Sequence, residues 1–418
     1  MRILHTADWH LGHRLYNRDR TPEHRAALNW LLETIQAEKI DLLIVAGDVF
    51  DVTNPSNQAK ELYYEFLAGL KRSCCTSAVI VGGNHDSASL LDAPRGLFRA
   101  LNLHVVGGAD TPASNRVFSI QCGQEEVIVA AVPYLRERDL RKASFGESNH
   151  DRLVALREGI RRHFTEIAAA AEALREGRPV PIVATGHLFA GGASDDEEKR
   201  SYIYQADENN IEAGEFPTCF DYVALGHVHR AQRVGDCDHI RYAGSLIPLT
   251  FVEGQRPRSV RVVELDRAGS PIRSHKLPLP FFRPLLRLNY ELEEVRQRLA
   301  AAVTGCDPTA PRTWAEVRVK TDASLPNLRD KLLKIIEEAH GNAPSAPPIE
   351  LVRISRERLT PRTISRREEE ETRQLDELQP HQVFEQLCVG CELPAEETVS
   401  LREDFNVLHN WWSERRTV

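Results

Sequence analysis

Five short segments of the chain place aspartate, asparagine and histidine side chains directly after runs of apolar residues. In order along the chain they are Asp8-Trp9-His10, Gly47-Asp48, Gly83-Asn84-His85-Asp86, Gly186-His187 and Gly226-His227-Val228-His229. Carboxylate, carboxamide and imidazole groups form a mixed oxygen and nitrogen ligand set, which suits manganese, iron or zinc better than calcium. The residue types therefore predict a metal site.

The spacing within these segments indicates how they could share that site. In an extended chain, residues two apart point to the same side, so Asp8 with His10, and His227 with His229, can each face one place. A single carboxylate at Asp48 could bridge two ions, which two-metal hydrolases hold about 3.5–4 Å apart. Any one pair alone is more often part of a turn or a hydrogen-bond network, but the five segments together predict a binuclear centre.

The apolar runs before these segments predict the scaffold. The runs at 2–7, 41–47, 77–83, 180–186 and 221–226 are short and rich in Val, Ile and Leu, which is typical of strands buried on both faces. Helices are expected between several of them, one with Thr21-Pro22 as its cap and first turn and another over 57–71. The pattern predicts an α/β fold, and open α/β sheets hold their ligands at the carboxyl ends of the strands.

The character of the sequence changes near residue 256, where a stretch rich in arginine and proline begins. After it, a predicted strand at 315–320 and an apolar helical face at 325–335 fit a compact second domain over 280–360. Residues 361–374 form a charged block that is expected to be a linker. Residues 375–418 predict two amphipathic helices, with apolar positions at Phe384, Leu387, Leu401, Phe405, Leu408 and Trp412. These helices either dock on their own chain or bind a partner helix or coiled coil, and the sequence leaves both open.

The composition argues against several classes of protein. A net charge of −8 over 418 residues disfavours a histone-like binder of nucleic acid, although a local basic patch could still hold a polyanion. The eight cysteines do not suggest a disulfide framework, and the N-terminus lacks a signal-peptide pattern. No apolar run approaches the roughly 20 residues that span a bilayer. We therefore expect a soluble, cytoplasmic protein.

The order D-x-H, GD, GNHD, GH and GHVH resembles the calcineurin-like metallophosphoesterases. The longer strings MRILHTADWHLG, VAGDVFD, GNHDS, ATGHL and YVALGHVHRAQ, with RYAGSLIPLTF at 241–251, are similar to the SbcD family of bacterial SbcCD nucleases. The resemblance covers essentially the whole chain, although the cap and the tail match only in length and pattern. It implies a layered sandwich of mixed sheets flanked by helices over 1–275, a small α/β capping and DNA-recognition domain over 280–360, and a C-terminal helical hairpin over 375–418.

The resemblance also implies two divalent metal ions, with Mn²⁺ the first choice, and assigns their ligands. One ion would be held by Asp8, His10, Asp48 and His229, and the other by Asp48, Asn84, His187 and His227. His85 would stay off the metals and donate a proton or hydrogen bond toward the leaving oxygen, with Asp86 beside it as an orienting partner.

The loop after His10 carries candidates for substrate contact. Arg14, Arg18 and Arg20 could lie along a nucleic-acid backbone, and Tyr16 could stack on a base or sugar. A solvated charged loop explains the same residues equally well on sequence alone, and the resemblance favours DNA.

By the same resemblance, the chain would be a nuclease subunit acting in DNA recombination, replication and repair. It would have ATP-dependent 3'-5' exonuclease activity on double strands and endonuclease activity on single strands and hairpins. The sequence contains no Gly-x-x-x-x-Gly-Lys-Ser/Thr phosphate loop, so ATP would act through an SbcC-type ATPase partner with a long coiled coil. A homodimer of SbcD chains within a heterotetramer is expected, and Leu62, Tyr63 and Phe66 are candidate interface residues.

Two other functions stay open at this stage. The same metal site could hydrolyse a cyclic nucleotide, a nucleotide-lipid or a phosphoprotein, because such sites serve many substrates across a superfamily. The extra domain, the tail and the first-loop arginines favour DNA. A non-enzymatic DNA-bridging scaffold with a decayed site is the other alternative, and against it every expected ligand is present in the sequence.

Overall fold

The computed structural model describes residues 1–141, 147–191, 211–307, 309–322, 325–341 and 346–359, together with 384, 388, 401, 402 and 404–406. Contacts divide the chain into two units, Met1–Glu357 and Arg358–Val418. Within the described ranges, no helix has both the length and the apolar character needed to cross a membrane.

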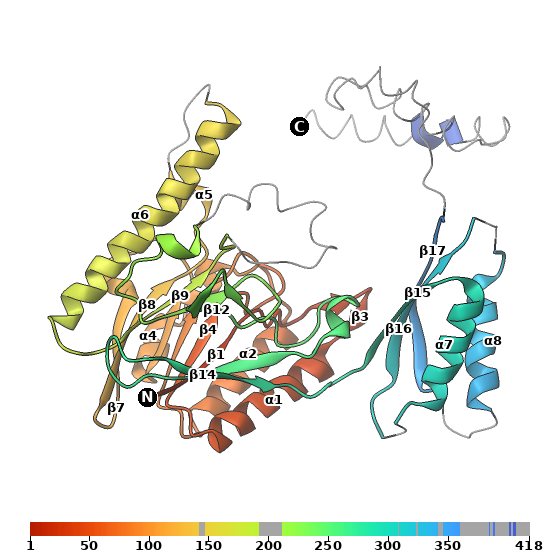
Figure 1. The fold of residues 1–418 in the computed structure, drawn as a ribbon, viewed down its shortest axis with the longest axis horizontal. Helices are drawn as coiled ribbons and strands as arrows, with labels where there is room; N and C mark the ends of the chain where they lie inside the picture. Colours follow the sequence, from red (N-terminus) through yellow and green to blue (C-terminus); the bar gives the residue numbers. More distant parts are fainter. Residues whose placement is uncertain are drawn as a thin grey trace. The chain divides into compact units, whose positions relative to one another are not determined.

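The first sheet of the larger unit has six strands and begins the chain (Figure 1). Its order is β14 (Arg273–Pro278), β13 (Ser259–Glu264), β1 (Arg2–Thr6), β4 (Leu42–Ala46), β5 (Ser77–Val81) and β6 (Leu103–Val106). The strands β1, β4, β5 and β6 run parallel, whereas β13 and β14 pair antiparallel. The sheet is covered on its outer face by α1 (Thr21–Ala37) and α2 (Asn57–Leu70), and α3 (Ala88–Asp92) and α4 (Arg95–Ala100) connect β5 to β6.

The second sheet also has six strands and completes a layered sandwich. Its order is β11 (Gln232–Val234), β12 (Cys237–Tyr242), β10 (Tyr222–Gly226), β9 (Ile182–His187), β8 (Glu125–Val132) and β7 (Val117–Cys122). Its outer face packs against α6 (Asn149–Arg175), and its inner face packs against the first sheet.

Alternation along β4 shows how one strand serves two layers. Leu43 and Val45 face α1 and α2, whereas Leu42 and Ile44 lie in the core between the two sheets. Both faces are buried, so the strand is apolar throughout, as its sequence predicted. The expected α/β fold, with mixed sheets flanked by helices, is confirmed.

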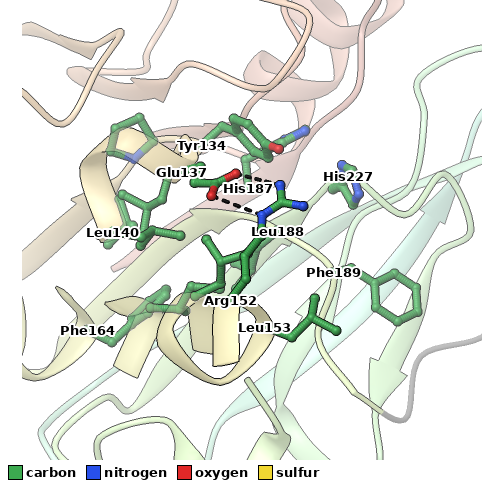
Figure 2. A pocket seen from close by; sticks show the side chains of 15 residues that line it. Tyr134, Glu137, Leu140, Arg152, Leu153, Phe164, His187, Leu188, Phe189 and His227 are labelled. Carbon is green, nitrogen blue, oxygen red and sulfur yellow. Dashed lines mark hydrogen bonds and ion pairs between the residues drawn. The ribbon is translucent and has the colours of Figure 1, made fainter. Parts of the chain in front are cut away.

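A cavity of about 170 Å³ lies between the second sheet and the helices α5 (Glu137–Leu140) and α6 (Figure 2). Its walls are mainly apolar and include Leu140, Leu153, Phe164 and Leu188. An ion pair of 2.6 Å between Arg152 Nη2 and Glu137 Oε2 belongs to its lining. His187 and His227 also line it, so the cavity adjoins the ends of β9 and β10.

The rest of the same unit is a three-stranded sheet with two helices, which we call the smaller layer. Three parallel strands, β15 (Leu285–Tyr290), β16 (Thr313–Lys320) and β17 (Ile349–Glu357), carry α7 (Leu292–Thr304) and α8 (Leu328–His340) on one face. The segment has an apolar core of its own. It also contacts the preceding part of the chain, because the Trp314 ring lies 4.5 Å from the Arg283 guanidinium and packs with Leu15 and Phe251.

Two expectations about the helices are corrected. Thr21 is the first residue of α1 and not its cap, a position that Arg20 takes without a side-chain cap bond. Leu62, Tyr63 and Phe66 cannot form a dimer interface in this fold, because their side chains are buried in the core between α2 and the first sheet.

The charged linker expected over 361–374, and most of the expected hairpin, lie outside the described residues. Leu387, Leu408 and Trp412 belong to that part. The rings of Phe384 and Phe405 stack at 4.4 Å, and Leu401 is 42% exposed.

Candidate metal centre

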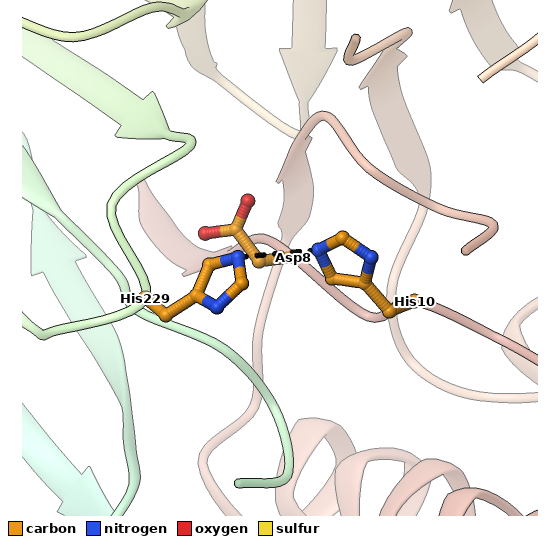
Figure 3. Close-up of side chains that lie close together, drawn as sticks. All are labelled: Asp8, His10 and His229. Atoms are coloured by element: carbon orange, nitrogen blue, oxygen red, sulfur yellow. Dashed lines mark hydrogen bonds between the residues drawn. The ribbon is translucent and has the colours of Figure 1, made fainter. Parts of the chain in front are cut away.

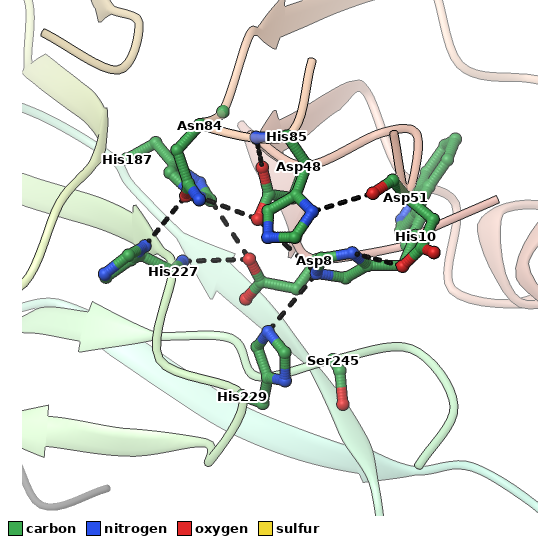
Figure 4. Close-up of polar contacts among 12 residues, drawn as sticks. Asp8, His10, Asp48, Asp51, Asn84, His85, His187, His227, His229 and Ser245 are labelled. Carbon is green, nitrogen blue, oxygen red and sulfur yellow. Dashed lines mark hydrogen bonds and ion pairs between the residues drawn. The ribbon is translucent and has the colours of Figure 1, made fainter. Parts of the chain in front are cut away.

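The polar segments singled out in the sequence meet at the carboxyl ends of five strands (Figure 4). The first sheet contributes residues that follow β1, β4 and β5, and the second sheet contributes residues at or just after the ends of β9 and β10. The residues brought together are Asp8, His10, Asp48, Asn84, His85, His187, His227 and His229. Residues more than 200 positions apart therefore become neighbours, as shown by the bond of 2.9 Å from the His227 backbone N–H to Asp8 Oδ1.

The backbone at this centre adopts unusual conformations. Asp8, His10, Asp48 and His227 have positive φ angles of 51°, 46°, 48° and 97°. Such angles cost about 1–3 kcal/mol each outside glycine and are found where surrounding structure enforces them. Here the Asp8 N–H donates to Gly47 O and the His10 N–H donates to Asp48 O, both at 3.0 Å. Asp8 and His10 thus converge because the chain turns beyond β1, and not by the strand alternation that the sequence suggested.

Two glycines allow the ends of the sheets to approach each other. A Cβ atom at Gly226 would lie 1.8 Å from Ala46 O, and one at Gly47 would lie 2.1 Å from His187 Nδ1. Gly47 also has a φ of +88°, which a larger side chain adopts only with strain. These glycines therefore let β4 and β10 bring their polar residues to one place.

One group of possible ligands is formed by Asp8, His10 and His229 (Figure 3). The Nε2 atoms of the two imidazoles lie 3.2 Å apart. His229 Nδ1 lies 3.1 Å from Glu253 Oε1, and His10 Nδ1 lies 3.2 Å from Asp51 Oδ1. If each Nδ1 donates its proton to the carboxylate beside it, each Nε2 presents a lone pair to the centre. Two facing lone pairs next to a carboxylate are suited to a cation between them.

A second set of side chains that meet at one place is formed by Asp48, Asn84, His187 and His227. His187 Nδ1 donates to Ala46 O at 2.9 Å, so its Nε2 faces Asn84 Oδ1 at 3.0 Å and Asp48 Oδ2 at 3.3 Å. His227 Nδ1 lies 3.0 Å from the same Asn84 oxygen. Acceptor atoms that converge in this way require a proton or a metal ion between them.

Asp48 connects the two groups. Its Oδ2 lies 3.4 Å from His10 Nε2 and 3.3 Å from His187 Nε2, while its Oδ1 accepts the backbone N–H of His85 at 2.9 Å. Burial opposes ionisation, but His187 and His10 hold the pKa of Asp48 well below its usual value. The buried carboxylate is therefore charged and lies where it can bridge two cations.

The imidazoles respond to Asp48 in different ways. Burial lowers the pKa of His10, and the charge of Asp48 only partly offsets this. Burial also opposes protonation of His187, but Asp48 and Asp8 raise the pKa of His187 to about 9. A proton on His187 Nε2 thus satisfies the converging oxygens that a metal ion would otherwise bind.

His85 and Asp86 have different environments. His85 is exposed, its Nδ1 donates to the backbone Asp51 O at 2.7 Å, and its ring lies 4.8 Å from that of His10. Asp86 is buried and accepts the backbone N–H groups of Gly83, Phe50 and Val49 at 2.8–3.0 Å.

The expectation that Asp86 orients His85 is therefore not met. The Asp86 carboxylate fastens the loop after β4 to the loop after β5, and the Asp51 carbonyl holds the His85 ring. Burial and the charge of Asp48 raise the pKa of Asp86 to about 6, against the three backbone donors, which lower it.

Sequence reasoning missed two carboxylates that hold imidazoles in place. Asp51, three residues after Asp48, contacts both His10 and His13, the latter at 3.1 Å. Glu253 is buried and holds His229, and it also accepts the Leu249 N–H at 3.1 Å. Carboxylates behind metal-binding histidines fix the tautomer and the ring orientation. The string VAGDVFD contained a signal for Asp51, whereas Glu253 followed no recognisable motif.

The expected substrate residues lie on a two-stranded hairpin, β2 (Arg14–Leu15) and β3 (Arg18–Asp19). Tyr16 lies under the guanidinium of Arg353, 4.8 Å from ring centroid to Cζ, and Arg18 pairs with Glu350 at 2.6 Å. Both partners belong to β17, so the hairpin contacts the smaller layer. Arg14 is exposed and donates to Asn17 O at 2.6 Å.

Arg20 does not fit the expected contact with nucleic acid. Its side chain is 1% exposed and donates to Pro248 O at 3.0 Å, beneath the Trp314 ring. Burial lowers the pKa of Arg20 to about 10, and Glu23 partly offsets that effect. The residue is part of the contact between the hairpin region and the smaller layer.

Known proteins match the chain along most of its length. The model of the calcineurin-like phosphoesterase family matches residues 1–231, and one described as the type 5 capsule protein repressor C-terminal domain matches residues 281–389. The SbcD subunit of nuclease SbcCD from Escherichia coli K12 is 34% identical over 384 residues, which cover 92% of each chain. The protein of the same name from Bacillus subtilis is 30% identical over 291 residues, covering 69% of this chain and 72% of that one.

Solved structures are also similar in part. A dimetal phosphatase from Danio rerio aligns with a TM-score of 0.38 and 11% identity, over 66% of this chain and 98% of that one. The family assignment rests on the sequence matches, which span both the polar segments of the metal centre and the smaller layer. The chain therefore belongs to the calcineurin-like phosphoesterase family and, within it, to the SbcD family of SbcCD nuclease subunits.

Proposed function

We propose that this chain is the nuclease subunit of an SbcCD-type complex and hydrolyses phosphodiester bonds of DNA at two divalent metal ions. The observation that carries the proposal is the position of Asp48 Oδ2, which lies 3.4 Å from His10 Nε2 and 3.3 Å from His187 Nε2. A buried, charged oxygen between two groups of ligand atoms is the arrangement that a bridged pair of ions requires.

The proposed ligands divide between the two ions. One set is Asp8, His10, Asp48 and His229, and the other is Asp48, Asn84, His187 and His227. Mixed imidazole, carboxylate and amide ligands suit manganese, iron or zinc, and the sequence resemblance makes Mn²⁺ the proposed ion. Two bound ions would lower the pKa of a water molecule and neutralise the nonbridging oxygens of a phosphodiester. The chain itself orients the imidazoles through Asp51, Glu253 and Ala46 O.

His85 is proposed as the group that protonates the leaving oxygen. Its Nδ1 donates a proton to the backbone carbonyl of Asp51, because a carbonyl oxygen can only accept. Nε2 is therefore the atom that exchanges a proton with the substrate. The ring is exposed beside His10, where a phosphodiester at the metal centre can reach it. General acid catalysis of this kind contributes about 10²–10⁴-fold.

The neighbouring cavity supports a nucleotide as the substrate. It adjoins His187 and His227 and is lined mainly by apolar side chains. An apolar cavity of about 150 Å³ holds benzene, so the cavity of about 170 Å³ has room for a single ring system. A base next to the scissile phosphate could therefore enter it, which favours a nucleic acid over a phosphoprotein.

We also propose the finer activities that the sequence resemblance implies. They are ATP-dependent 3'-5' exonuclease action on double strands and endonuclease action on single strands and hairpins, in DNA recombination, replication and repair. An SbcC-type ATPase is the proposed partner, bound through the tail over 375–418, with two SbcD chains in a cytoplasmic heterotetramer. The relatives named as SbcD subunits of nuclease SbcCD support this assignment.

The decisive experiment is a nuclease assay on end-labelled hairpin DNA, with and without the ATPase, in buffers that contain Mn²⁺, Mg²⁺ or EDTA. We expect cleavage that depends on Mn²⁺ and is altered by the ATPase with ATP. Hydrolysis of bis(p-nitrophenyl) phosphate without any cleavage of DNA would instead identify a phosphodiesterase for small substrates.

A further inference from the structure

A second cavity adjoins His229 and lies between edge strands of the two sheets. It has a volume of about 350 Å³ and is open to the surface. Its lining comes from the ends of β10 and β12 in the second sheet and from β13 and β14 with the segment before β13 in the first. The residues are His229, Arg230, Ala231, Ala243, Gly244, Ser245, Arg256, Pro257, Arg258, Ser259, Lys276 and Pro278. We call it the edge pocket.

The edge pocket is strongly basic. Arg230, Arg256 and Lys276 are exposed, and Arg258 is buried. Among the described residues that line the pocket there is no aspartate or glutamate. Glu253 lies behind the lining, where its Oε2 is 3.5 Å from Arg258 Nη1. Four cationic side chains thus line the pocket, in a chain whose net charge is −8, and Glu253 partly offsets the charge of Arg258.

Lys276 is held at the wall of the edge pocket. Its Nζ donates to the backbone Ala231 O at 3.1 Å, and an ammonium group has three donors in all. Burial lowers the pKa of Lys276, and Arg261, Arg241 and Arg230 lower it further. These three neighbouring charges are all positive, so an anion placed there would relieve their repulsion of the ammonium group.

The edge pocket is tied to the metal centre through His229. Arg258 Nη1 donates to His229 O at 2.7 Å, and the Ser245 N–H donates to the same oxygen at 3.1 Å. The same residue presents Nε2 to His10 within the metal centre. His229 therefore lines both the edge pocket and the metal centre.

We propose that the edge pocket binds a backbone phosphate of the DNA strand whose scissile phosphate lies at the metal centre. The inference rests on the proposed function and adds the contact that holds the strand beyond the cleavage point. A chain with net negative charge repels DNA at long range, so its affinity must come from local basic sites of this kind. The arginine-rich stretch that starts near residue 256 supplies Arg256, Arg258 and Lys276 to this site.

The test compares Lys276→Gln and the double variant Lys276→Gln/Arg256→Gln with Arg273→Gln in the full chain. Arg273 lies on the same strand as Lys276 but outside the edge pocket, where it pairs with Glu264 and Asp266 at 3.3 and 3.4 Å. Binding of a fluorescent single-stranded oligonucleotide is measured by anisotropy in EDTA at several salt concentrations. Each lost phosphate contact should reduce the slope of log K against log salt by about 0.7.

We expect a slope reduced by about one contact for Lys276→Gln and about two for the double variant, with Arg273→Gln unchanged. Equal slopes for all proteins would overturn the inference. So would competition by inorganic phosphate at micromolar concentration, because the pocket would then be a site for a free anion. Cleavage of end-labelled hairpin DNA by the unsubstituted protein with its ATPase partner tests the metal centre separately. Its failure would refute the proposed function and would leave the slopes to decide on the pocket.

Discussion

The Nε2 atoms of His10 and His229 lie 3.2 Å apart, while the Nδ1 atom of each ring faces a carboxylate, Asp51 or Glu253. Two imidazoles held in this way direct lone pairs at each other, which is unfavourable until a cation lies between them. The two carboxylates have thus fixed the rings in the orientation that a metal ion needs.

His229→Ala should remove one of the two proposed ions. We expect the bound manganese, measured by elemental analysis after dialysis, to fall from about two ions per chain toward one, because the Asp48, Asn84, His187 and His227 set stays intact. His275→Ala is the matched control, since His275 is an exposed histidine of β14. Equal metal contents in both variants would contradict the proposed ligand set.

Metal affinity should rise with pH between about 7 and 9. In the metal-free protein, Asp48 raises the pKa of His187 to about 9, so below that pH a metal ion must displace the proton on Nε2. The apparent affinity should therefore decrease about tenfold per unit as the pH falls from 9 to 7. Titration with a fluorescent chelator as competitor measures this slope.

The same shift has a consequence for the stability of the metal-free fold. A raised histidine pKa stabilises the fold fully below the unfolded value of 6.5, and that contribution is lost as the pH rises through about 9. In the metal titration, an affinity that does not vary between pH 7 and 9 would show that His187 carries no proton to displace.

Asp51→Asn should weaken metal binding without removing a proposed ligand. The neutral amide oxygen accepts a proton from the imidazoles of His10 and His13 more weakly than the charged carboxylate does, although the backbone Asp51 O still holds His85. Loss of such a supporting carboxylate typically costs 10–100-fold, so we expect roughly that loss in manganese affinity by isothermal titration. Asp266→Asn, at an exposed aspartate, is the control and should bind manganese normally.

His85→Ala should lose nuclease activity while retaining both metal ions. If Nε2 protonates the leaving oxygen, kcat on DNA should fall about 10²–10⁴-fold. Hydrolysis of bis(p-nitrophenyl) phosphate should fall much less, because p-nitrophenolate leaves without protonation. Full nuclease activity with manganese bound, or equal losses on both substrates, would show that His85 has another role.

Removal of residues 375–418 should abolish binding of the ATPase partner. The deletion takes away the apolar positions of the two expected helices, which are the proposed docking site for the ATPase. The metal centre is unaffected, because it lies entirely within Met1–Glu357. We expect the shortened chain to bind manganese and cleave bis(p-nitrophenyl) phosphate at the normal rate but to be absent from affinity purifications of the ATPase. Unchanged co-purification would place the docking site elsewhere.

Local patterns in the sequence predicted the scaffold well. The five apolar runs became β1, β4, β5, β9 and β10, because a strand buried on both faces must be apolar along its whole length. The same logic located the polar segments, since residues just beyond parallel strands share one edge of a sheet. The start of α1 was misplaced by one residue because Thr21 bonds to Asp19 and not to its own helix.

Burial and long-range contacts were beyond the reach of such patterns. Leu62, Tyr63 and Phe66 form an apolar stripe that could face either a core or a partner, and only the packing of α2 on the first sheet showed them to be buried. Arg20 looked like its neighbours in the loop, yet it lies beneath Trp314, almost three hundred residues later. Charge and polarity alone do not reveal which side of a loop faces solvent.

The sequence by itself determined the residue types at the metal centre and the strand ends that carry them, because short-range periodicity and ligand chemistry are local properties. Only the tertiary structure decided which imidazole nitrogen is directed inward, since that depends on Asp51, Ala46 O and Glu253, which come from separate parts of the chain. It also decided that Asp86 fastens loops and that Asp48 lies between two groups of ligands. Such relations depend on distances across the two sheets, and those distances are set only when the sheets pack together.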